Sequence, residues 1–513
     1  MPGSKTSLLR KAVLFRISKA KLNIISTMAS QIVTIICGLV VPRLLLGAFG
    51  SAQYGLTVSI TQFLSFVALF EGGIGGVARA RLYDPLAHGN EKEISAVFRA
   101  EQEFFRHLGL AFILYSIILG LFFRNIAHAD EYSGPYLFAL VMAISLSSIA
   151  KYMFGLPNLT IILADQRKYV NSMIMIATTI INMIAVMVLV NRSLDILWVK
   201  LGSSLVFIAR PVIYSIYTRK HYNIQKTEKA VLEQKWTGIG QHIAYYLHMN
   251  ADIILLTVFA DIKWVAVYSV YSLIITNIRA LTESFSGSME AAFGELIAKK
   301  QQNRLVRSYK KYTGLITAVT VVLFSCTGIL ILDFVRLYTK GVNDADYFQP
   351  AFAMILLAAE SVNCLSLTSS SMPIAANQIK QTRWGAYGEA LINITVSLSL
   401  IHWNPLVGVA LGTLAATVFR GIYYVIYASG RVLHLPVYRQ VIHLVCYLGV
   451  IMILTAIGYK VVARLSIDNF LQWCICGVLV FIVISVPASL LLKSYLKRID
   501  EQNKGQKEDP DNQ

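Results

Sequence analysis

Charged side chains lie inside stretches of sequence that are otherwise apolar, and they are the residues of this chain best placed to do chemistry. Six are basic, and Arg420, Lys151 and Lys200 are the weaker candidates among them, the lysines because they fall near predicted span ends. The stronger three are arginines: Arg43, Arg210 and Arg279. A guanidinium group is planar, permanently charged and able to bind two phosphate oxygens at once. Because a charge inside a bilayer costs about 2.5 to 3.5 kcal/mol on insertion scales, such residues usually face a cavity or a partner. We therefore expect these arginines to line a cavity. The alternatives are that Arg43 reaches the membrane surface and that the other two pair with acids, Glu283 being four residues after Arg279.

The same apolar stretches contain acids that could bind a proton or a sodium ion. Five acids lie in them: Glu71, Asp252, Glu283, Glu360 and Glu389. Asp252, Glu71 and Glu360 are the candidates for coupling or for polar positions in a cavity. Asp252 comes first, because it follows His248 by four residues and shares a helix face with it. The alternative for Asp252 is a structural hydrogen bond to a neighbouring helix, and Glu71 could equally lie at a helix interface.

The elements that must position these residues are membrane-spanning helices. Of the 513 residues 56% are hydrophobic and 14% charged, and the mean hydropathy is +0.59. Soluble domains have about 45 to 50% apolar and about 25% charged residues. Fourteen apolar stretches each have about the 20 residues that a helix needs to cross a bilayer. Ten are clear: 22–46, 107–123, 135–157, 169–190, 195–217, 312–332, 350–373, 405–428, 440–459 and 469–492. Four are interrupted by polar residues: 54–77, 238–260, 264–285 and 386–402. The sequence predicts an all-α polytopic membrane protein with about 14 transmembrane helices, or 12 or 13 if a weaker stretch stays outside.

The formal net charge of +18 comes mostly from one side of the membrane. With the N-terminus inside, the cytoplasmic segments hold 33 of the 46 Lys and Arg residues, the outside connections hold 7, and 6 lie within spans. Cytoplasmic loops of membrane proteins are enriched in these residues. We therefore predict an even number of spans with both termini cytoplasmic. The charge excess orients the protein and does not indicate nucleic-acid binding.

Connections between the spans leave no room for a catalytic domain. The largest are the basic ranges 78–106, 218–237 and 286–311, which are shorter than the roughly 50 residues of a small domain. We expect helices at the membrane surface in each. The sequence has no GxxxxGK[ST] phosphate loop and no HExxH motif, and its six cysteines show no metal or disulfide spacing. We expect no enzymatic activity, no metal and no cofactor.

An internal similarity suggests that the chain contains two related halves. Residues 44–64 can be laid over residues 254–274, and each segment joins two predicted helices by a short outside turn. The identical pairs are Leu45 and Leu255, Leu46 and Leu256, Phe49 and Phe259, and Ser59 and Ser269. Transporters built from two such halves bind their substrate between them.

The predicted domain organisation follows from this repeat as two six-helix bundles plus two C-terminal helices. Its parts are an N-terminal half 1–217, a cytoplasmic linker 218–237, a C-terminal half 238–430, two further helices in 431–493 and a disordered tail 494–513.

A residue pattern near the N-terminus resembles a known family. It comprises Asn23, Gln31, Val41-Pro42-Arg43, Phe49-Gly50, Tyr54-Gly55-Leu56, Gln62, Glu71-Gly72-Gly73-Ile74-Gly75 and the polar stretch 82–87. This pattern is similar to that of the Wzx-type oligosaccharide flippases of the multidrug/oligosaccharidyl-lipid/polysaccharide exporter superfamily. The resemblance is concentrated in the first hundred residues, and the rest of the chain agrees in helix count and loop charge.

The resemblance implies a multi-pass protein of the bacterial inner membrane that moves an undecaprenyl-diphosphate-linked oligosaccharide between leaflets. The product would be O-antigen, capsule or exopolysaccharide, with polysaccharide polymerase machinery as a partner. Arg43, Arg210 and Arg279 would hold the diphosphate during alternating access, and a H⁺ or Na⁺ gradient could drive the cycle through Asp252. Two alternatives stay open: a cation-coupled multidrug antiporter of the same superfamily, and a peptidoglycan-precursor flippase.

Overall fold

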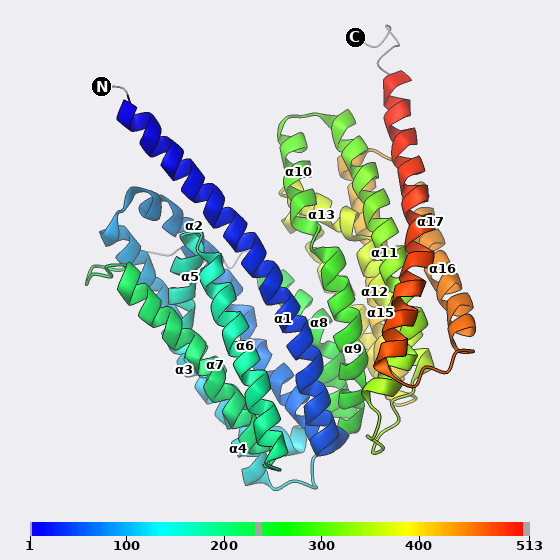
Figure 1. Ribbon diagram of the computed structural model, residues 1–513, viewed down its shortest axis with the longest axis horizontal. Coiled ribbons are helices and arrows are strands. Elements are labelled where there is room, and N and C mark those ends of the chain that lie inside the picture. The colour runs from blue at the N-terminus through cyan, green and yellow to red at the C-terminus, as the bar shows by residue number, and fades with distance from the viewer. Residues whose placement is uncertain (1–2, 231–238, 506–513) are drawn as a thin grey trace. The chain divides into compact units, whose positions relative to one another are not determined.

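The computed structural model describes residues 3–230 and 239–505, which fold into α-helices joined by short connections (Figure 1). No residue within these ranges forms a β-strand. Ten of the described helices are long and apolar enough to cross a membrane, and a bent helix pair makes an eleventh. The prediction of an all-α polytopic membrane protein is therefore confirmed. The chain divides into two compact units, unit 1 (Met1–Ile239) and unit 2 (Gly240–Gln513).

The first two predicted spans of unit 1 meet at a sharp break in α1 (Gly3–Leu64). Gly50 within this helix has φ 75° and ψ 179°, far from helical values. Residues with a Cβ rarely adopt a positive φ, so a glycine is needed where the chain changes direction this abruptly. The predicted spans 22–46 and 54–77 lie on either side of the break, and the second continues through the 3₁₀ turn η1 (Ser65–Phe70).

Six further helices complete unit 1. They are α2 (Gly72–His88), α3 (Glu91–Ile126), α4 (Gly134–Ala150), α5 (Leu156–Ala164), α6 (Lys168–Asn191) and α7 (Ile196–His221). A π-helical turn, η2 (Lys151–Gly155), joins α4 to α5. The 36 residues of α3 span about 54 Å, more than the hydrocarbon core of about 30 Å. The basic range 78–106 is thus helical as expected, being made of α2 and the start of α3.

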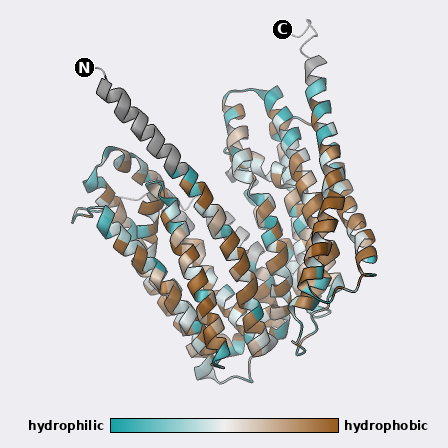
Figure 2. Cartoon of the chain, in the orientation of Figure 1, coloured by the Kyte–Doolittle hydropathy of each residue, from teal (hydrophilic) through white to brown (hydrophobic). Residues whose placement is uncertain are grey.

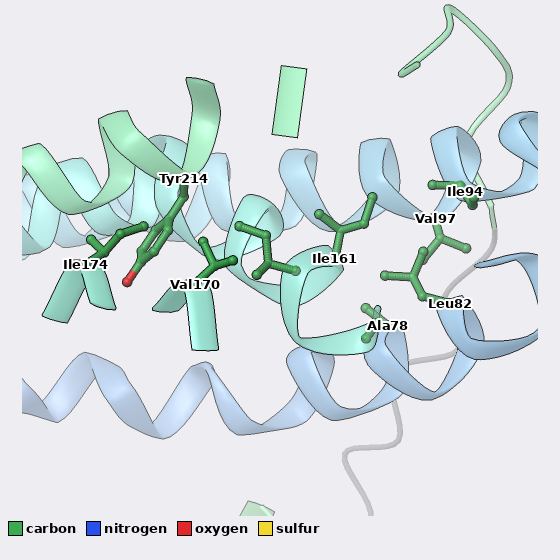
Figure 3. Packing of buried hydrophobic residues seen from close by; sticks show 10 residues of the cluster. Ala78, Leu82, Ile94, Val97, Ile161, Val170, Ile174 and Tyr214 are labelled. Carbon is green, nitrogen blue, oxygen red and sulfur yellow. The ribbon is translucent and has the colours of Figure 1, made fainter. Parts of the chain in front are cut away.

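A buried apolar cluster holds one end of these helices together (Figure 3). Leu82 of α2, Val97 of α3 and Ile161 of α5 are fully buried in it. The cluster consists of Ala78, Leu82, Ile94, Val97, Ile161, Ile162, Ala164, Val170, Ile174 and Tyr214. Because it ties α2, α3, α5, α6 and α7 to one another, it fixes the helices that carry the polar residues of unit 1.

After α7 the chain runs extended along α3 instead of forming a helix. Residues 222–230 have no helical turn. The backbone N–H of Gln225 donates to Ser95 Oγ at 2.9 Å, and that of Ala230 donates to the carbonyl of Ala96 at 3.1 Å. Two backbone N–H groups of the segment therefore find their acceptors on α3. In a helix such groups would donate to carbonyls of the same helix.

The expectation of a surface helix in the range 218–237 is accordingly wrong for residues 222–230, and residues 231–238 lie outside the described residues. Tyr222 anchors the start of the extended segment by donating its hydroxyl to Asp165 at 2.7 Å. Burial is the main cause that raises the pKa of Tyr222, and the hydrogen bond to the Asp165 carboxylate raises it further. The phenol therefore stays protonated and donates.

Unit 2 contains ten α-helices in its described residues. They are α8 (Ile239–Phe259), α9 (Ile262–Glu283), α10 (Ser286–Ala298), α11 (Gln302–Tyr338), α12 (Pro350–Leu365), α13 (Leu367–Ala375), α14 (Arg383–Leu400), α15 (Pro405–Tyr427), α16 (Val437–Val462) and α17 (Phe470–Gly505). Short turns η3 (Ile379–Thr382) and η4 (Ala428–Leu433) precede α14 and follow α15. The predicted span 350–373 is α12 and α13, bent by 41°.

One weaker predicted span gains support from its aromatic residues. The range 386–402 is not among the ten spanning helices and corresponds to α14. Trp384 and Trp403 flank it and are 65% and 81% exposed. The 18 residues of α14 span about 27 Å, and tryptophans gather at the two interfaces of a bilayer whose core is about 30 Å thick. The spacing favours a spanning role for α14.

The C-terminal helix is longer than the sequence predicts. In Figure 2, α16 and α17 are mostly coloured as hydrophobic over long stretches. The range 494–513, expected to be disordered, continues α17 as helix to Gly505, and the residues after it lie outside the described part of the chain. Asp500 accounts for the helical continuation of α17, because it pairs with Lys311 of α11 at 2.7 Å and also with Arg307.

Candidate functional site

Unit 2 encloses a small cavity of about 50 Å³ that is lined by charged and hydroxyl-bearing side chains. Three predicted site residues meet there: Asp252 from α8, Arg279 from α9 and Glu360 from α12. The other lining residues are Tyr268, Ser272, Ile275, Thr276, Leu356 and Thr413. Helices that are far apart in the sequence therefore bring half of the predicted site residues into one place.

Asp252 is buried in the wall of this cavity, with 4% of its surface exposed. Its Oδ2 accepts a hydrogen bond from Tyr268 Oη at 2.9 Å and another from Thr413 Oγ1 at 2.7 Å. Carboxylate and hydroxyl oxygens are the ligand types that hard cations prefer, and a carboxylate can also take up a proton. The side chain of His248, expected on the same helix face, lies outside the described residues.

The guanidinium of Arg279 is held between two carboxylates. Its Nη1 donates to both carboxylate oxygens of Glu360, at 3.0 and 3.3 Å, and its Nε lies 3.3 Å from Glu283 Oε1. The side chains of Arg279 and Glu360 are only 11% and 9% exposed. The pair with Glu283, expected from the spacing of four residues, is present, and Glu360 adds a partner from another helix.

A second buried ion pair lies in the same unit. Arg420 of α15 donates through Nη1 to Glu389 of α14 at 3.1 Å, and the Glu389 side chain is 3% exposed. Asn393, one turn further along α14, donates to Thr413 at 3.4 Å. Two arginines thus share the interior of unit 2 with three buried acids, Asp252, Glu360 and Glu389, and Arg279 also contacts the partly exposed Glu283. With the acids ionised the cluster is formally negative, which suits a cation better than a phosphate.

Unit 1 contains a larger pocket of about 350 Å³, lined by both polar and apolar side chains. Glu71 lies in its wall, and Glu71 Oε1 accepts hydrogen bonds from Lys151 Nζ and from Tyr152 Oη, each at 2.6 Å. Lys151 and Tyr152 come from the π-helical turn η2, a kind of bulge that is frequent at functional sites. Besides Tyr152, six serines and threonines line the same pocket: Thr61, Ser65, Ser147, Ser148, Ser203 and Ser204.

Lys200 of α7 is the second cation of this pocket. Among the described residues no carboxylate lies within 4 Å of its ammonium group. Lys151 and Lys200 were weak candidates in the sequence, because each falls near the predicted end of a span. The structure places both in the pocket wall with one carboxylate, Glu71, and the pocket therefore has a formal charge of +1.

The two remaining predicted arginines line neither of these cavities. Arg210 of α7 donates through Nε to Thr178 at 2.7 Å and through Nη2 to Thr179 at 2.9 Å, and its guanidinium lies 4.4 Å from the ring centre of Phe207. Arg43 of α1 lies close to Gly47, where a Cβ would come within 3.2 Å of Nη1. Both arginines are partly buried in unit 1.

The fold is shared with membrane transporters of known structure. No family model and no curated protein matches the sequence. The structure is similar to lipid II flippase MurJ in an inward closed conformation, with a TM-score of 0.66 and 16% identity over 90% of this chain and 98% of that one. For the MATE multidrug transporter DinF-BH the TM-score is 0.57 with 18% identity, over 82% and 96% of the two chains. The eukaryotic MATE transporter AtDTX14 gives 0.55 with 12% identity, over 84% and 99%.

These similarities define the class of fold. One further solved structure with this fold, at a TM-score of 0.53, is described as a MATE family transporter of the MOP superfamily. The chain thus has the fold of that superfamily, the one that the N-terminal pattern resembles. The Wzx-type family within it stays a prediction, because identities of 10 to 18% show the fold and not the substrate.

Proposed function

We propose that this protein is a flippase that moves an undecaprenyl-diphosphate-linked oligosaccharide across the bacterial inner membrane for the synthesis of a surface polysaccharide. The observation that carries this proposal is the pocket of unit 1, which combines two lysines, one glutamate and seven hydroxyl-bearing residues. Ammonium groups bind phosphate oxygens, and hydroxyl groups can donate to and accept from sugar hydroxyls. Such a lining suits an anionic, hydroxyl-rich ligand.

The diphosphate would be bound by cations of unit 1. Lys200 is the first of them, because its ammonium group lines the pocket with no carboxylate among the described residues within 4 Å. Arg210 does not line this pocket, but it is held by threonine hydroxyls rather than by an acid and stays a proposed diphosphate ligand. Arg43, on the helix that carries the family pattern, also lies outside the pocket and stays a proposed ligand. Arg279 belongs instead to the acidic network of unit 2, since two carboxylates already neutralise it.

The driving ion would bind in unit 2 at Asp252. This carboxylate is buried, has two hydroxyl neighbours and opens on the small cavity that it shares with Glu360. A proton or a sodium ion bound there would reduce the excess negative charge of that interior. We propose that its binding and release accompany the alternating-access cycle. The expected topology, with both termini cytoplasmic, and the expected partnership with a polysaccharide polymerase belong to this proposal.

Two other functions each have an observation in their favour. A peptidoglycan-precursor flippase is favoured by the TM-score of 0.66 to a structure described as a lipid II flippase. A cation-coupled multidrug antiporter is favoured by the acidic interior of unit 2 and by the similarity to MATE transporters. We prefer the oligosaccharide because the unit 1 pocket has a formal charge of +1, which disfavours an organic cation, and hydroxyl groups that suit a sugar.

Reconstitution into liposomes tests the proposal. Leaflet transfer of a fluorescent undecaprenyl-diphosphate oligosaccharide is measured by quencher accessibility, with lipid II and an organic cation as the other substrates. Wild type should transfer the oligosaccharide, and Lys200→Gln should slow transfer about tenfold or more, the effect of losing a charge-assisted hydrogen bond. Lys460→Gln, at an exposed lysine, is the matched control. Transfer of lipid II or of the organic cation alone would overturn the oligosaccharide assignment.

A further inference from the structure

A separate pocket of about 310 Å³ lies where three connections of unit 2 meet. It is formed by the turn between α10 and α11, by the residues after α13 and by η4. Figure 1 shows α10 and α13 side by side near the start of α11, and these helices contact one another. All three connections, 286–311, 374–385 and 429–439, belong to the side that the distribution of Lys and Arg predicts to be cytoplasmic.

The charged groups of this pocket are both cations. Lys300 lines it from the α10–α11 turn and Arg431 from η4. Within the described residues neither has a carboxylate at ion-pair distance, and Arg431 instead lies 5.4 Å from the ring centre of Tyr427. The neighbouring acid Glu295 is paired with Lys299 at 2.5 Å. The described lining consists of Leu296, Ile297, Lys300, Gln301, Gln302, Leu305, Ala376, Gln378, Arg431 and Val432, with no carboxylate among them.

The amides of the pocket also present donors. Gln378 uses its side-chain oxygen to accept from Tyr427 Oη at 2.9 Å. Gln301 uses its oxygen to accept from Arg304 at 3.1 Å. With each oxygen engaged, the amide nitrogens are the groups left for a ligand. The N-terminus of α11 adds to this, because no side chain caps its first N–H groups.

Apolar side chains complete the wall below these donors. Leu296, Ile297, Leu305 and Val432 line the pocket, and Leu305 belongs to the buried cluster that packs α10 against α11 and α13. Gln302 closes one edge by donating to the carbonyl of Val432 at 2.9 Å. A ligand that fits such a pocket carries phosphate oxygens at one end and an apolar part at the other.

We propose that this pocket binds the phosphate headgroup of an anionic phospholipid from the cytoplasmic leaflet. The headgroup oxygens accept from Lys300, Arg431 and the two glutamine amides, and the glycerol and first methylenes lie against the apolar wall. Negative surface potential concentrates such lipids near basic segments of membrane proteins. A bound headgroup joins the α10–α11 turn to η4. This site is separate from the pockets that serve the proposed transport function and does not depend on the transported substrate.

Native mass spectrometry of the full chain in detergent tests the site by titration with phosphatidylglycerol, with phosphatidylcholine as the zwitterionic comparison and inorganic phosphate as the soluble one. The double variant Lys300→Gln/Arg431→Gln should raise the Kd for phosphatidylglycerol about thirtyfold, the expected effect of two lipid-facing cations. The matched control is Lys380→Gln/Arg439→Gln, which removes one exposed lysine and one exposed arginine from the same predicted side but outside the pocket. It should change the Kd less than twofold.

A substitution that leaves the charge unchanged distinguishes lipid binding in the pocket from lipid attraction by surface charge alone. Gln378→Ala leaves the net charge unchanged and should weaken phosphatidylglycerol binding about fivefold by removing one amide donor. Equal loss of affinity in the two double variants, or no loss in Gln378→Ala, would overturn the proposal. A Lys300- and Arg431-dependent affinity for inorganic phosphate but not for phosphatidylglycerol would also overturn it, because the ligand would then be a soluble anion.

Discussion

The polar interiors of the two units carry opposite formal charge. In unit 1, Lys151 and Lys200 line a pocket with one carboxylate, Glu71. In unit 2, Arg279 and Arg420 are enclosed with three buried acids, Asp252, Glu360 and Glu389. The Lys151–Glu71 ion pair of unit 1 is also more exposed to solvent than the Arg279–Glu360 pair of unit 2. The Lys151 side chain is 45% exposed and that of Arg279 is 11% exposed.

This difference separates two uses of charge inside a membrane protein. Ions that are partly solvated, as in the Lys151–Glu71 pair of unit 1, can exchange their partner for a ligand at little cost. Ions that are buried and mutually paired, as in unit 2, are held in place, because an unpaired charge there would be costly. We infer that unit 1 handles the anionic substrate and that unit 2 handles a small cation.

The largest expected effect lies in the buried network. Glu360→Ala leaves Arg279 with Glu283 alone, whose side chain is 42% exposed. Breaking a buried ion pair from one side costs about 3 to 5 kcal/mol of unfolding free energy. Denaturant unfolding in mixed micelles measures this loss. Glu283→Ala is the control, with an expected loss of about 1 kcal/mol, and equal losses in the two variants would show that Glu360 is not the main partner.

A smaller effect is expected from the corresponding change in unit 1. Lys151→Met removes the ion pair with Glu71 but keeps the hydrogen bond from Tyr152. Because both partners of the pair reach solvent, the expected loss of unfolding free energy is about 1 kcal/mol or less. The same denaturant assay compares it with Glu360→Ala. A loss as large as that of Glu360→Ala would mean that the contrast between a wet and a dry interior is wrong.

The fold class and the single-helix contacts follow from local sequence. Apolar stretches of about 20 residues reveal membrane helices because the bilayer imposes one length, and each of the 14 predicted stretches corresponds to helix in the described residues. The pair of Arg279 with Glu283 follows from helix periodicity. Gly50 marks the break between the first two spans because only the backbone conformation at one residue is involved.

Contacts between helices could not be predicted in the same way. Glu360 lies 81 residues from Arg279, and Lys151 lies 80 residues from Glu71. Which helix faces meet is decided by packing over the whole unit, and a single sequence does not encode that in any local spacing. Lys200 is another example, because its place near a predicted span end puts it below the arginines although it lines the larger pocket.

The division of charge between the units is tested most directly by measuring both ligands on the same purified protein. Binding of the undecaprenyl-diphosphate oligosaccharide and of Na⁺ or H⁺ is determined for wild type, Lys200→Gln and Asp252→Asn. We expect Lys200→Gln to weaken oligosaccharide binding about tenfold and to leave cation binding unchanged. Asp252→Asn should abolish cation binding and leave the oligosaccharide affinity, measured without the cation, unchanged. Loss of oligosaccharide binding in Asp252→Asn, with full binding in Lys200→Gln, would contradict the account.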